Sequence, residues 1–268
     1  MNRPKADVRE FWDRASCGKE LYLAGQDRAA YEAQAETRYA LEPYIPAFAG
    51  FNSAQGLRVL EIGVGLGADH QRFAEAGAAL SGIDLTERAV KHTRRRLAVF
   101  GLASDLAVGD AENLQFTDES FDLVYSWGVL HHSPDAPKTV AEVRRVLKRG
   151  GEARIMVYHK WSIVGLMLWV RYALLGLKPW LPLQEIYARY LESPGTKSYS
   201  VAEARKLFDD FSQVQIRTVL THGDLLESDA GQRHRGLLLT LARKLWPRRV
   251  IRRLLPGAGL FMLIEARK

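Results

Sequence analysis

An apolar run that passes straight into a glycine-rich loop most constrains how this chain can fold. Residues 57–62 read LRVLEI, and glycines follow at positions 63, 65 and 67. A buried strand that leads through such a loop into a helix is typical of an open α/β sheet, in which ligands bind at the carboxyl ends of the strands. Because glycine has no side chain, a ligand can lie directly against the backbone there.

A carboxylate stands at the end of the next predicted strand. Asp84 follows the apolar residues 79–83 and lies 21 residues after Gly63. At that position a carboxylate can accept hydrogen bonds from both ribose hydroxyls of a nucleoside. The glycine loop and Asp84 together predict a cofactor that contains adenosine.

The glycines alone do not decide which adenosine cofactor binds. Gly63, Gly65 and Ala68 also satisfy the relaxed dinucleotide fingerprint. Three features argue against NAD. Glu61 precedes the loop, where it would repel a pyrophosphate but suit a cationic ligand. No Tyr is followed four residues later by Lys, so the catalytic pair of short-chain dehydrogenases is missing, and the rest of the chain is too short for a second catalytic domain.

Strands and helices alternate along the central part of the chain. Such alternation predicts a parallel sheet with helices on both faces. The predicted strands are 57–62, 79–83, 105–108, 121–126 and 153–158, with helices at 67–76, 86–99 and 135–147. Two more strands, 214–220 and 260–266, follow a helix that the capping-box residues Ser200 and Glu203 begin.

Two segments interrupt this alternation and define the predicted domains. Residues 1–50 are helical in pattern up to Pro43 and Pro46 and form an N-terminal cap. Residues 161–199 form an inserted helical lid, so that the core consists of 51–160 and 200–268. The lid carries an apolar helical stripe that either faces a substrate or packs on the sheet; its residues are Ile163, Met167, Val170, Leu174 and Leu177.

The composition excludes several classes of protein. Apolar residues make up 47% and charged residues 26% of the chain, as in globular rather than disordered or fibrous proteins. Cys17 is the single cysteine, which excludes an intramolecular disulfide framework and a cysteine metal cluster. The N-terminus lacks the apolar core of a signal peptide, and Arg171 interrupts the longest apolar stretch, 161–177. We therefore expect a cytoplasmic protein without a membrane span.

Positive charge is concentrated near the C-terminus. Residues 230–264 contain eight Lys and Arg and no Asp or Glu, whereas the whole chain carries a net charge of +7. Such a segment forms a solvated helix face or attracts an anionic surface, either nucleic acid or lipid. Residues 237–255 alternate Leu, Trp and Arg as interfacial helices do, so a weak membrane-surface contact through 233–253 stays open.

Six motifs, in order over residues 57–158, resemble those of class I S-adenosylmethionine-dependent methyltransferases of the small-molecule, type 11-like kind. They are VLEIGVGLG (59–67), GIDL (82–85), GDAE (109–112), FDLVYS (121–126), VLHH (129–132) and LKRGG (147–151). The resemblance implies an α/β fold with a Rossmann-like, seven-stranded, mostly parallel sheet that ends in a C-terminal antiparallel hairpin. It also implies S-adenosyl-L-methionine as cofactor and S-adenosyl-L-homocysteine as product.

The resemblance further implies a role for each motif residue. Glu61 and the loop glycines, Gly63, Gly65 and Gly67, would hold the methionine end of the cofactor. Asp84, followed by Leu85, would hold the ribose. Asp110 would accept a hydrogen bond from the adenine amine, with Ala111 beside the ring, and Glu112 would also contact the cofactor. A simple turn after Gly109 would also explain Asp110. Ser126 and Trp127 would line the cofactor side of the cleft, although Trp127 could instead be a packed core aromatic.

Methyl transfer is an in-line displacement whose leaving group departs neutral, so alignment is the main requirement. A base helps when the nucleophile is a hydroxyl or an ammonium. His131, His132 and His159 lie at predicted strand ends, and Tyr22 lies in the predicted cap. His131, His132 and Tyr22 are our catalytic candidates, although relatives carry a histidine at the position of His132 for many substrates, which favours an orienting role. We predict no metal site.

The predicted acceptor is a small, apolar or aromatic molecule, because apolar pockets provide most small-molecule binding. Three rival hypotheses stay open. The chain could be a peripheral membrane enzyme that acts on a lipid or quinone through 233–253. It could also be a nucleic-acid or protein methyltransferase, although SWGV at 126–129 stands where a base-flipping motif would be expected. Finally, it could bind the cofactor without catalysis. The oligomeric state is not predicted.

Overall fold

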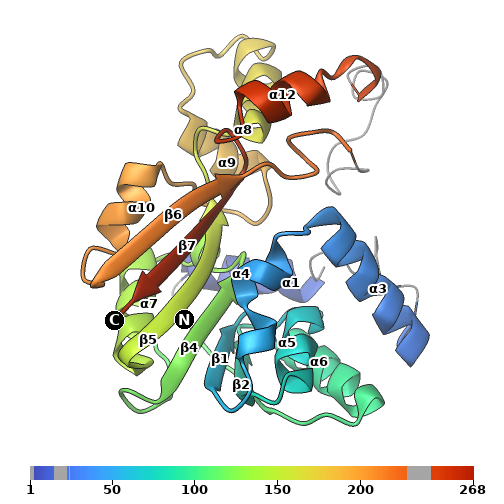
Figure 1. The fold of residues 1–268 in the computed structure, drawn as a ribbon. Helices are drawn as coiled ribbons and strands as arrows, with labels where there is room; N and C mark the ends of the chain where they lie inside the picture. Colours follow the sequence, from blue (N-terminus) through green and yellow to red (C-terminus); the bar gives the residue numbers. More distant parts are fainter. Residues whose placement is uncertain (1–2, 15–22, 24, 228–242) are drawn as a thin grey trace.

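The computed structural model describes residues 3–14, 23, 25–227 and 243–268 (Figure 1). A single sheet has the strand order β3-β2-β1-β4-β5-β7-β6. The strands are β1 (Arg58–Ile62), β2 (Ala79–Asp84), β3 (Asp105–Val108), β4 (Phe121–Trp127), β5 (Leu147–Tyr158), β6 (Gln213–Val219) and β7 (Phe261–Arg267). Strands β1 to β5 pair in parallel, whereas β7 pairs antiparallel with both β5 and β6. The predicted mostly parallel sheet with an antiparallel hairpin is confirmed.

Strand β5 begins earlier than predicted. We placed its start at 153, after a glycine turn, but pairing with β4 already begins at Leu147. The register then shifts opposite Phe121 and Leu123, and Gly150 has a φ of 77°. The two glycines therefore lie in an irregularity inside a longer strand, where a positive φ is tolerated without cost.

Four helices flank the core sheet: α5 (Ala68–Glu75), α6 (Glu87–Phe100), α7 (Ala136–Val146) and α10 (Val201–Leu207). The side chains of Thr86 and Asp135 cap α6 and α7, and Ser200 forms the predicted capping box of α10 with Glu203. Two buried clusters occupy the two faces of the sheet. One includes Val143 of α7 and Ala204 of α10, and the other includes Phe73 of α5.

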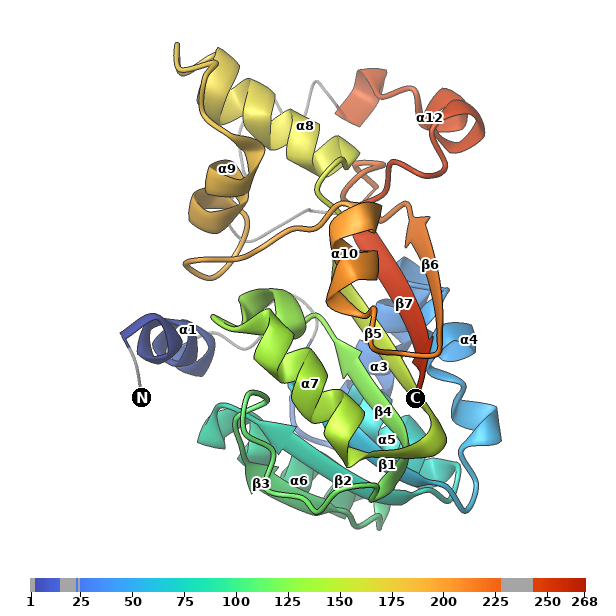
Figure 2. The same cartoon turned by 90° about the vertical axis from the view of Figure 1, so that its left-hand side faces the viewer.

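The described residues near the N-terminus form α1 (Arg3–Arg14), α3 (Arg28–Leu41), α4 (Ile45–Ala49) and the short helix η1 (Phe51–Ser53). Pro43 lies just beyond α3, but the prediction that Pro43 and Pro46 end the helical region is wrong at Pro46, because α4 continues to Ala49. Pro46 lies in the first turn of α4, where a missing N–H costs nothing. Figure 2 shows α1 between the edge of the sheet at β3 and the lid helix α9.

The lid extends beyond the carboxyl ends of the parallel strands (Figures 1 and 2). It contains α8 (Ile163–Trp169), the π-helical turn η3 (Val170–Leu174) and α9 (Leu183–Tyr190), and α12 (Arg248–Leu254) packs beside α8. The five residues of the predicted apolar stripe do not share one environment. Ile163 is buried, whereas Leu174 and Leu177 are exposed. Among the described residues, no helix is long and apolar enough to cross a membrane.

Candidate functional site

The glycine loop between β1 and α5 leaves room against its backbone. Gly63, Gly65 and Gly67 all have positive φ values, which only glycine adopts without strain. A Cβ at Gly63 would lie 2.1 Å from Val129, and one at Gly67 would lie 2.9 Å from Thr93. A Cβ at Gly65 would meet no atom within 4 Å. Gly63 and Gly67 are therefore needed for packing, and Gly65 faces the open space that a cofactor requires.

Asp84 lies directly beside this loop. Its Oδ2 accepts a hydrogen bond from the Gly65 backbone N–H at 3.2 Å, and its Oδ1 accepts from the N–H and hydroxyl of Thr86. Burial raises the pKa of Asp84, while the bonds from Thr86 and Gly65 oppose that rise. The structure thus brings the loop and the carboxylate into contact, and Leu85 next to Asp84 is half-buried.

Glu61 is engaged by a residue that the sequence analysis missed. Its Oε2 lies 2.8 Å from Nδ1 of His70, and Nε2 of His70 lies 2.8 Å from the Ser104 hydroxyl. Because Ser104 donates to the Leu80 carbonyl, it accepts from Nε2–H of His70, which leaves Nδ1 as an acceptor. Burial raises the pKa of Glu61 well above its usual value and lowers that of His70 to about 3. The proton therefore lies on Glu61, in a neutral pair beneath the loop.

A second buried network anchors the start of α5. Asp69 accepts two hydrogen bonds from the Arg38 guanidinium, at 3.0 and 2.7 Å. It also accepts from the hydroxyls of Tyr39 and Tyr125. Burial alone would raise the pKa of Asp69, but Arg38 and these hydrogen bonds lower it overall. The network joins the N-terminal helix α3 to the helix that follows the glycine loop.

Arg96 on α6 supports the loop from the other side. Its side chain is fully buried, and its guanidinium donates to four neutral oxygens. These are Oε1 of Gln71, Oε1 of Gln34 and the carbonyls of Leu66 and Tyr31. Burial lowers the pKa of Arg96 to about 10, so the group stays charged near pH 7. One side chain thus joins the loop, α3, α5 and α6.

Helix α1 closes over the predicted adenine side. Nζ of Lys5 lies 2.6 Å from Asp110 and 2.5 Å from Glu112. Glu112 also accepts hydrogen bonds from the Ser133 hydroxyl and the Asp135 N–H, and Asp110 accepts from the Glu112 N–H. The bond from the Glu112 N–H to Asp110 is the contact expected if Asp110 simply forms a turn after Gly109. If Asp110 also binds the adenine amine, its carboxylate would be shared between that amine and Lys5.

The two residues predicted after β4 are both packed into the protein. Ser126 is fully buried, and its hydroxyl donates to the Ile62 carbonyl of β1 at 3.0 Å. Trp127 is half-buried and packs among aromatic rings, with the Arg38 guanidinium 5.8 Å from its ring centre. Those rings belong to Tyr44, Phe48 and Phe261. This packing matches the core alternative for Trp127. Ala111 is half-buried against the first core cluster.

Two adjacent histidines form the centre of a second cluster, on the short helix η2 (Leu130–His132) that follows β4. His131 is fully buried, its ring stacks on Tyr158 at 3.9 Å, and neither ring nitrogen has a hydrogen-bond partner among the described residues. Nε2 of His132 lies 3.3 Å from Oε2 of Glu192, which accepts from the Tyr158 hydroxyl at 2.6 Å. Glu192 belongs to the lid and lies in no motif, so the sequence analysis missed it.

The lid and α1 both reach this histidine cluster. Nδ1 of His132 lies 2.8 Å from the Ser193 hydroxyl and 3.2 Å from that of Thr196. The ring of Trp12 on α1 packs edge-on against His132 at 5.1 Å. Burial and His132 together lower the pKa of His131 well below its usual value, so His131 is neutral. One donor atom each from His131, His132 and Glu192 lies within 4.8 Å of the others, which is also a spacing that a metal ion can bridge.

Of the remaining candidates, the structure describes His159. Nδ1 of His159 lies 3.1 Å from the Gly259 carbonyl, which gives this imidazole a structural partner. Tyr22 lies outside the described residues, as does the basic stretch up to residue 242.

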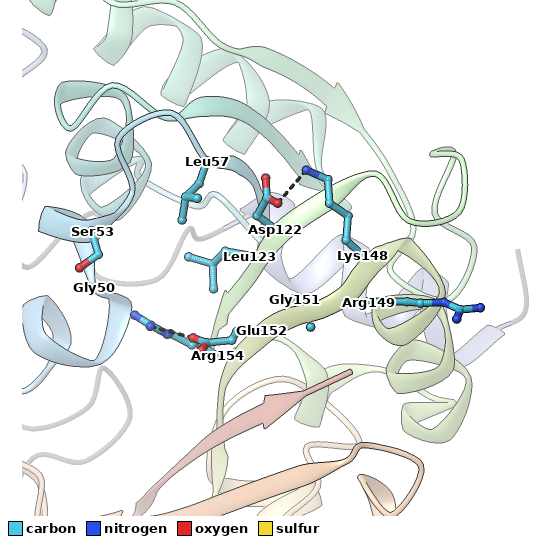
Figure 3. Close-up of a pocket in the computed structure, with 11 residues that line it drawn as sticks. Gly50, Ser53, Leu57, Asp122, Leu123, Lys148, Arg149, Gly151, Glu152 and Arg154 are labelled. Atoms are coloured by element: carbon cyan, nitrogen blue, oxygen red, sulfur yellow. Dashed lines mark hydrogen bonds and ion pairs between the residues drawn. The ribbon is translucent and has the colours of Figure 1, made fainter.

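A separate cavity of about 300 Å³ lies at the opposite end of the strands (Figure 3). It is lined by the starts of β4 and β5 together with Gly50 and Ser53. Two of its carboxylates are already paired, Asp122 with Lys148 and Glu152 with Arg154 (Figure 3). Ligands of open α/β sheets bind at the carboxyl ends of the strands, so this cavity is not the candidate site.

The ion pairs of Lys5 predict how firmly α1 docks on the carboxylates of Asp110 and Glu112. Replacing Lys5 with Met leaves Asp110 and Glu112 without their cation, so α1 should undock more often. Hydrogen exchange at the amides of residues 5–14 should become about tenfold faster, because exchange follows the local opening equilibrium. The matched variant Arg9→Met changes an exposed cation of the same helix and should leave exchange unchanged. Equal exchange in the Lys5 variant and the parent would show that these ion pairs do not hold α1.

The strand order, the reversed last strand and the glycine loop define the fold of class I methyltransferases. Residues 60–155 match the family model described as a methyltransferase domain. The chain thus carries a domain of the class I S-adenosylmethionine-dependent methyltransferases, and S-adenosylmethionine is the cofactor of that class.

Two curated relatives illustrate the sequence similarity. A phosphatidylethanolamine N-methyltransferase of Cereibacter sphaeroides is 34% identical over 39% of this chain and 52% of its own length. A phthiotriol/phenolphthiotriol dimycocerosates methyltransferase of Mycobacterium ulcerans is 43% identical over 36% of this chain and 35% of its own length. The chain therefore spans about half or less of the length of these relatives.

A solved structure shows the same fold over nearly the whole chain. The magnesium protoporphyrin IX methyltransferase of Synechocystis PCC 6803, with S-adenosylhomocysteine bound, has a TM-score of 0.59 and 15% identity. The match covers 99% of this chain and all of that one. The N-terminal helices and the lid are included in this alignment.

Proposed function

We propose that this protein transfers the methyl group of S-adenosylmethionine to a small apolar or amphiphilic acceptor at the His131–His132–Glu192 cluster. The observation that carries the proposal is the fully buried imidazole of His131, whose two nitrogens lack partners among the described residues. An unsatisfied buried polar group is costly, and a ligand that bonds to it would remove that cost. The lid that contributes Glu192 is the segment expected to select the acceptor.

The cofactor would bind along the glycine loop, with its ribose at Asp84. The space at Gly65 and the carboxylate beside it fit such a group. When bound, S-adenosylmethionine supplies an electrophilic methyl group whose bond to sulfur breaks, with the electron pair left on a neutral thioether. The residues of this chain need only align the acceptor behind that methyl group and exclude water.

The acceptor proton would pass to the His132–Glu192 pair. If Nδ1–H of His132 donates to the Ser193 or Thr196 hydroxyl, Nε2 carries a lone pair that faces Glu192 at 3.3 Å. A proton shared between Nε2 and the carboxylate removes the repulsion between them. As the acceptor oxygen or nitrogen forms its bond to the methyl carbon, it would release its proton. That proton would move to the position between Nε2 of His132 and the Glu192 carboxylate. His131 is neutral and offers a hydrogen bond that orients the acceptor.

The names of the relatives support an apolar or amphiphilic acceptor. Two of them are named for phosphatidylethanolamine and for phthiotriol dimycocerosates. The test is a screen of apolar amines and hydroxyl compounds, read by release of S-adenosylhomocysteine. Turnover of an acceptor that depends on His132 supports the proposal. Cofactor binding without any turnover would instead support a domain that binds but does not catalyse.

Replacing Asp84 with Ala should weaken S-adenosylhomocysteine binding by about 1.5–3 kcal/mol, because it removes charge-assisted bonds to the ribose. Calorimetry measures the change, and NAD should not compete in the parent protein. Asp105→Ala is a matched control, since Asp105 is an exposed carboxylate at the far end of the neighbouring strand. Unchanged affinity in the Asp84 variant would place the ribose elsewhere.

A further inference from the structure

The lid end of the molecule carries an unusual apolar surface. Twelve large apolar side chains are exposed among the described residues, and nine of them lie in two segments, 166–180 and 245–255. Both segments lie at the same end of the fold in two perpendicular views (Figures 1 and 2). These nine residues form what we name the apolar end surface: Leu166, Leu174, Leu175, Leu177, Trp180, Leu245, Val250, Leu254 and Leu255.

The two segments are held together by their own small core. Ile163 and Met167 of α8 pack with Ile251 of α12 and with Trp246, so these helices turn other faces outward. Leu177 is 82% exposed and Trp180 is 74% exposed. Monomeric proteins rarely expose so many large apolar side chains in one region unless it binds something.

The charge of this region has one sign. Residues 161–182 and 243–260 contain eight Lys and Arg and no Asp or Glu. Six of the eight are exposed: Arg171, Lys178, Lys244, Arg249, Arg252 and Arg253. Of these six, Arg252 alone makes an ion pair with a described carboxylate, that of Glu227. The other five make no ion pair with a carboxylate in the described part of the chain, so they could bind an anionic partner.

The apolar end surface is connected to the candidate site through α9. Ile186 of α9 packs against Leu168 of α8, and the rings of Tyr172 and Tyr190 stack at 3.8 Å. Glu192 follows two residues after α9 and contacts Tyr158 and His132. A ligand that enters at this surface would therefore reach the histidine cluster along the lid.

We propose that the apolar end surface docks this protein onto a bilayer rich in anionic lipid. Leu and Trp side chains insert at the boundary between headgroups and acyl chains, and Lys and Arg bind anionic headgroups beside them. These two segments carry positive charge and no carboxylates, which is complementary to the uniformly negative surface of an anionic bilayer. A protein partner would usually present charges of both signs. The inference deepens the proposed function, on which it rests, because the acceptor would then come from the membrane.

The test is sedimentation of the full chain with vesicles. Vesicles of phosphatidylglycerol and phosphatidylcholine should bind the protein, whereas pure phosphatidylcholine should bind it weakly, and 0.5 M salt should release much of it. The double variant Arg249→Glu/Arg253→Glu should lower partitioning onto anionic vesicles roughly 25-fold, at roughly fivefold for each cation lost. Arg248 and Arg252 are left unchanged, because Arg248 donates to the Leu225 and Leu226 carbonyls and Arg252 pairs with Glu227.

Two further variants keep the test specific. Leu177→Ser/Trp180→Ser should reduce binding to anionic vesicles at least tenfold without altering net charge. The matched control, Lys138→Glu/Lys206→Glu, makes the same charge change at exposed cations of α7 and α10 and should stay within about twofold of the parent. Equal loss in this control would overturn the docking surface, because binding would then follow net charge alone.

Failure of docking and failure of the proposed function can be distinguished. Turnover of a detergent-dispersed acceptor without any vesicle binding would overturn docking and leave methyl transfer intact. Vesicle binding that the surface variants abolish, in a protein without turnover, would support docking and count against the proposed function. A dimer that Leu177→Ser/Trp180→Ser dissociates, with no vesicle binding, would assign this surface to a second copy and overturn the proposal.

Discussion

Replacing Arg96 with Ala should lower the free energy of unfolding by about 4 kcal/mol. The variant removes a donor from two glutamine side-chain oxygens and from the Leu66 and Tyr31 carbonyls, of which the Tyr31 carbonyl lies within α3 and keeps a helical partner. Each unsatisfied buried acceptor costs about 1–3 kcal/mol, and a water in the new cavity offsets part of that total. Urea unfolding followed by circular dichroism measures the loss. Affinity for S-adenosylhomocysteine should also fall, because the Leu66 carbonyl belongs to the glycine loop, where we propose that the cofactor binds.

The neighbouring Arg95 supplies the matched control. Arg95 is exposed on the same helix, so Arg95→Ala should change stability by no more than about 0.5 kcal/mol. Arg96→Lys keeps the charge but loses the planar guanidinium that reaches four acceptors. Its loss of stability should lie between those of Arg96→Ala and Arg95→Ala. If Arg96→Ala lowered the free energy of unfolding no more than Arg95→Ala does, water would have to replace every hydrogen bond of the guanidinium. That result would contradict a structural role for Arg96.

Replacing His132 with Asn should lower kcat by about 10²- to 10⁴-fold with an acceptor found in the screen, because a positioned base contributes rate on that scale. The residue lies in the second cluster rather than at the glycine loop, so calorimetry should show unchanged affinity for S-adenosylhomocysteine. Loss of cofactor affinity together with activity would indicate a structural role for His132 instead.

Ser193→Ala separates orientation from proton transfer. It removes one hydroxyl that holds Nδ1 of His132, while Thr196 remains 3.2 Å away. We expect a loss of kcat of about tenfold, well below that of the His132 variant. Glu192→Gln removes the carboxylate that faces Nε2 and should approach the effect of His132→Asn. Full activity in both His132→Asn and Glu192→Gln would show that transfer needs no base from this cluster.

Local signals in the sequence predicted most of the sheet and its helices. Thr86, Asp135 and the Ser200–Glu203 pair cap the helices that they were expected to begin, because capping depends on residues only a few positions apart. The start of β5 and the end of the N-terminal helical region at Pro46 were placed wrongly. The pairing of β5 with β4 and the packing of α4 decide these boundaries rather than local propensity.

The groups that support the site could not be predicted in the same way. Lys5 meets Glu112 across 107 positions of the chain, and Arg96 meets Gln34 across 62. Arg96 also lies in the run Arg94–Arg96, which reads as a solvated helix face. Glu192 has no motif around it and reaches His132 only because the lid folds back over η2. Pairing over such distances is a property of the folded chain.

Helix α1 places its two ends over different parts of the site. Lys5 contacts the carboxylates of the predicted adenine side, and Trp12, two turns later, contacts His132. Under the proposed function, cofactor and acceptor would both lie against this docked helix. The first ligand to bind would bear the free-energy cost of fixing the position of α1, and the second would then bind to a helix already in place. Cofactor and acceptor should therefore bind synergistically, each raising the affinity for the other by the same factor.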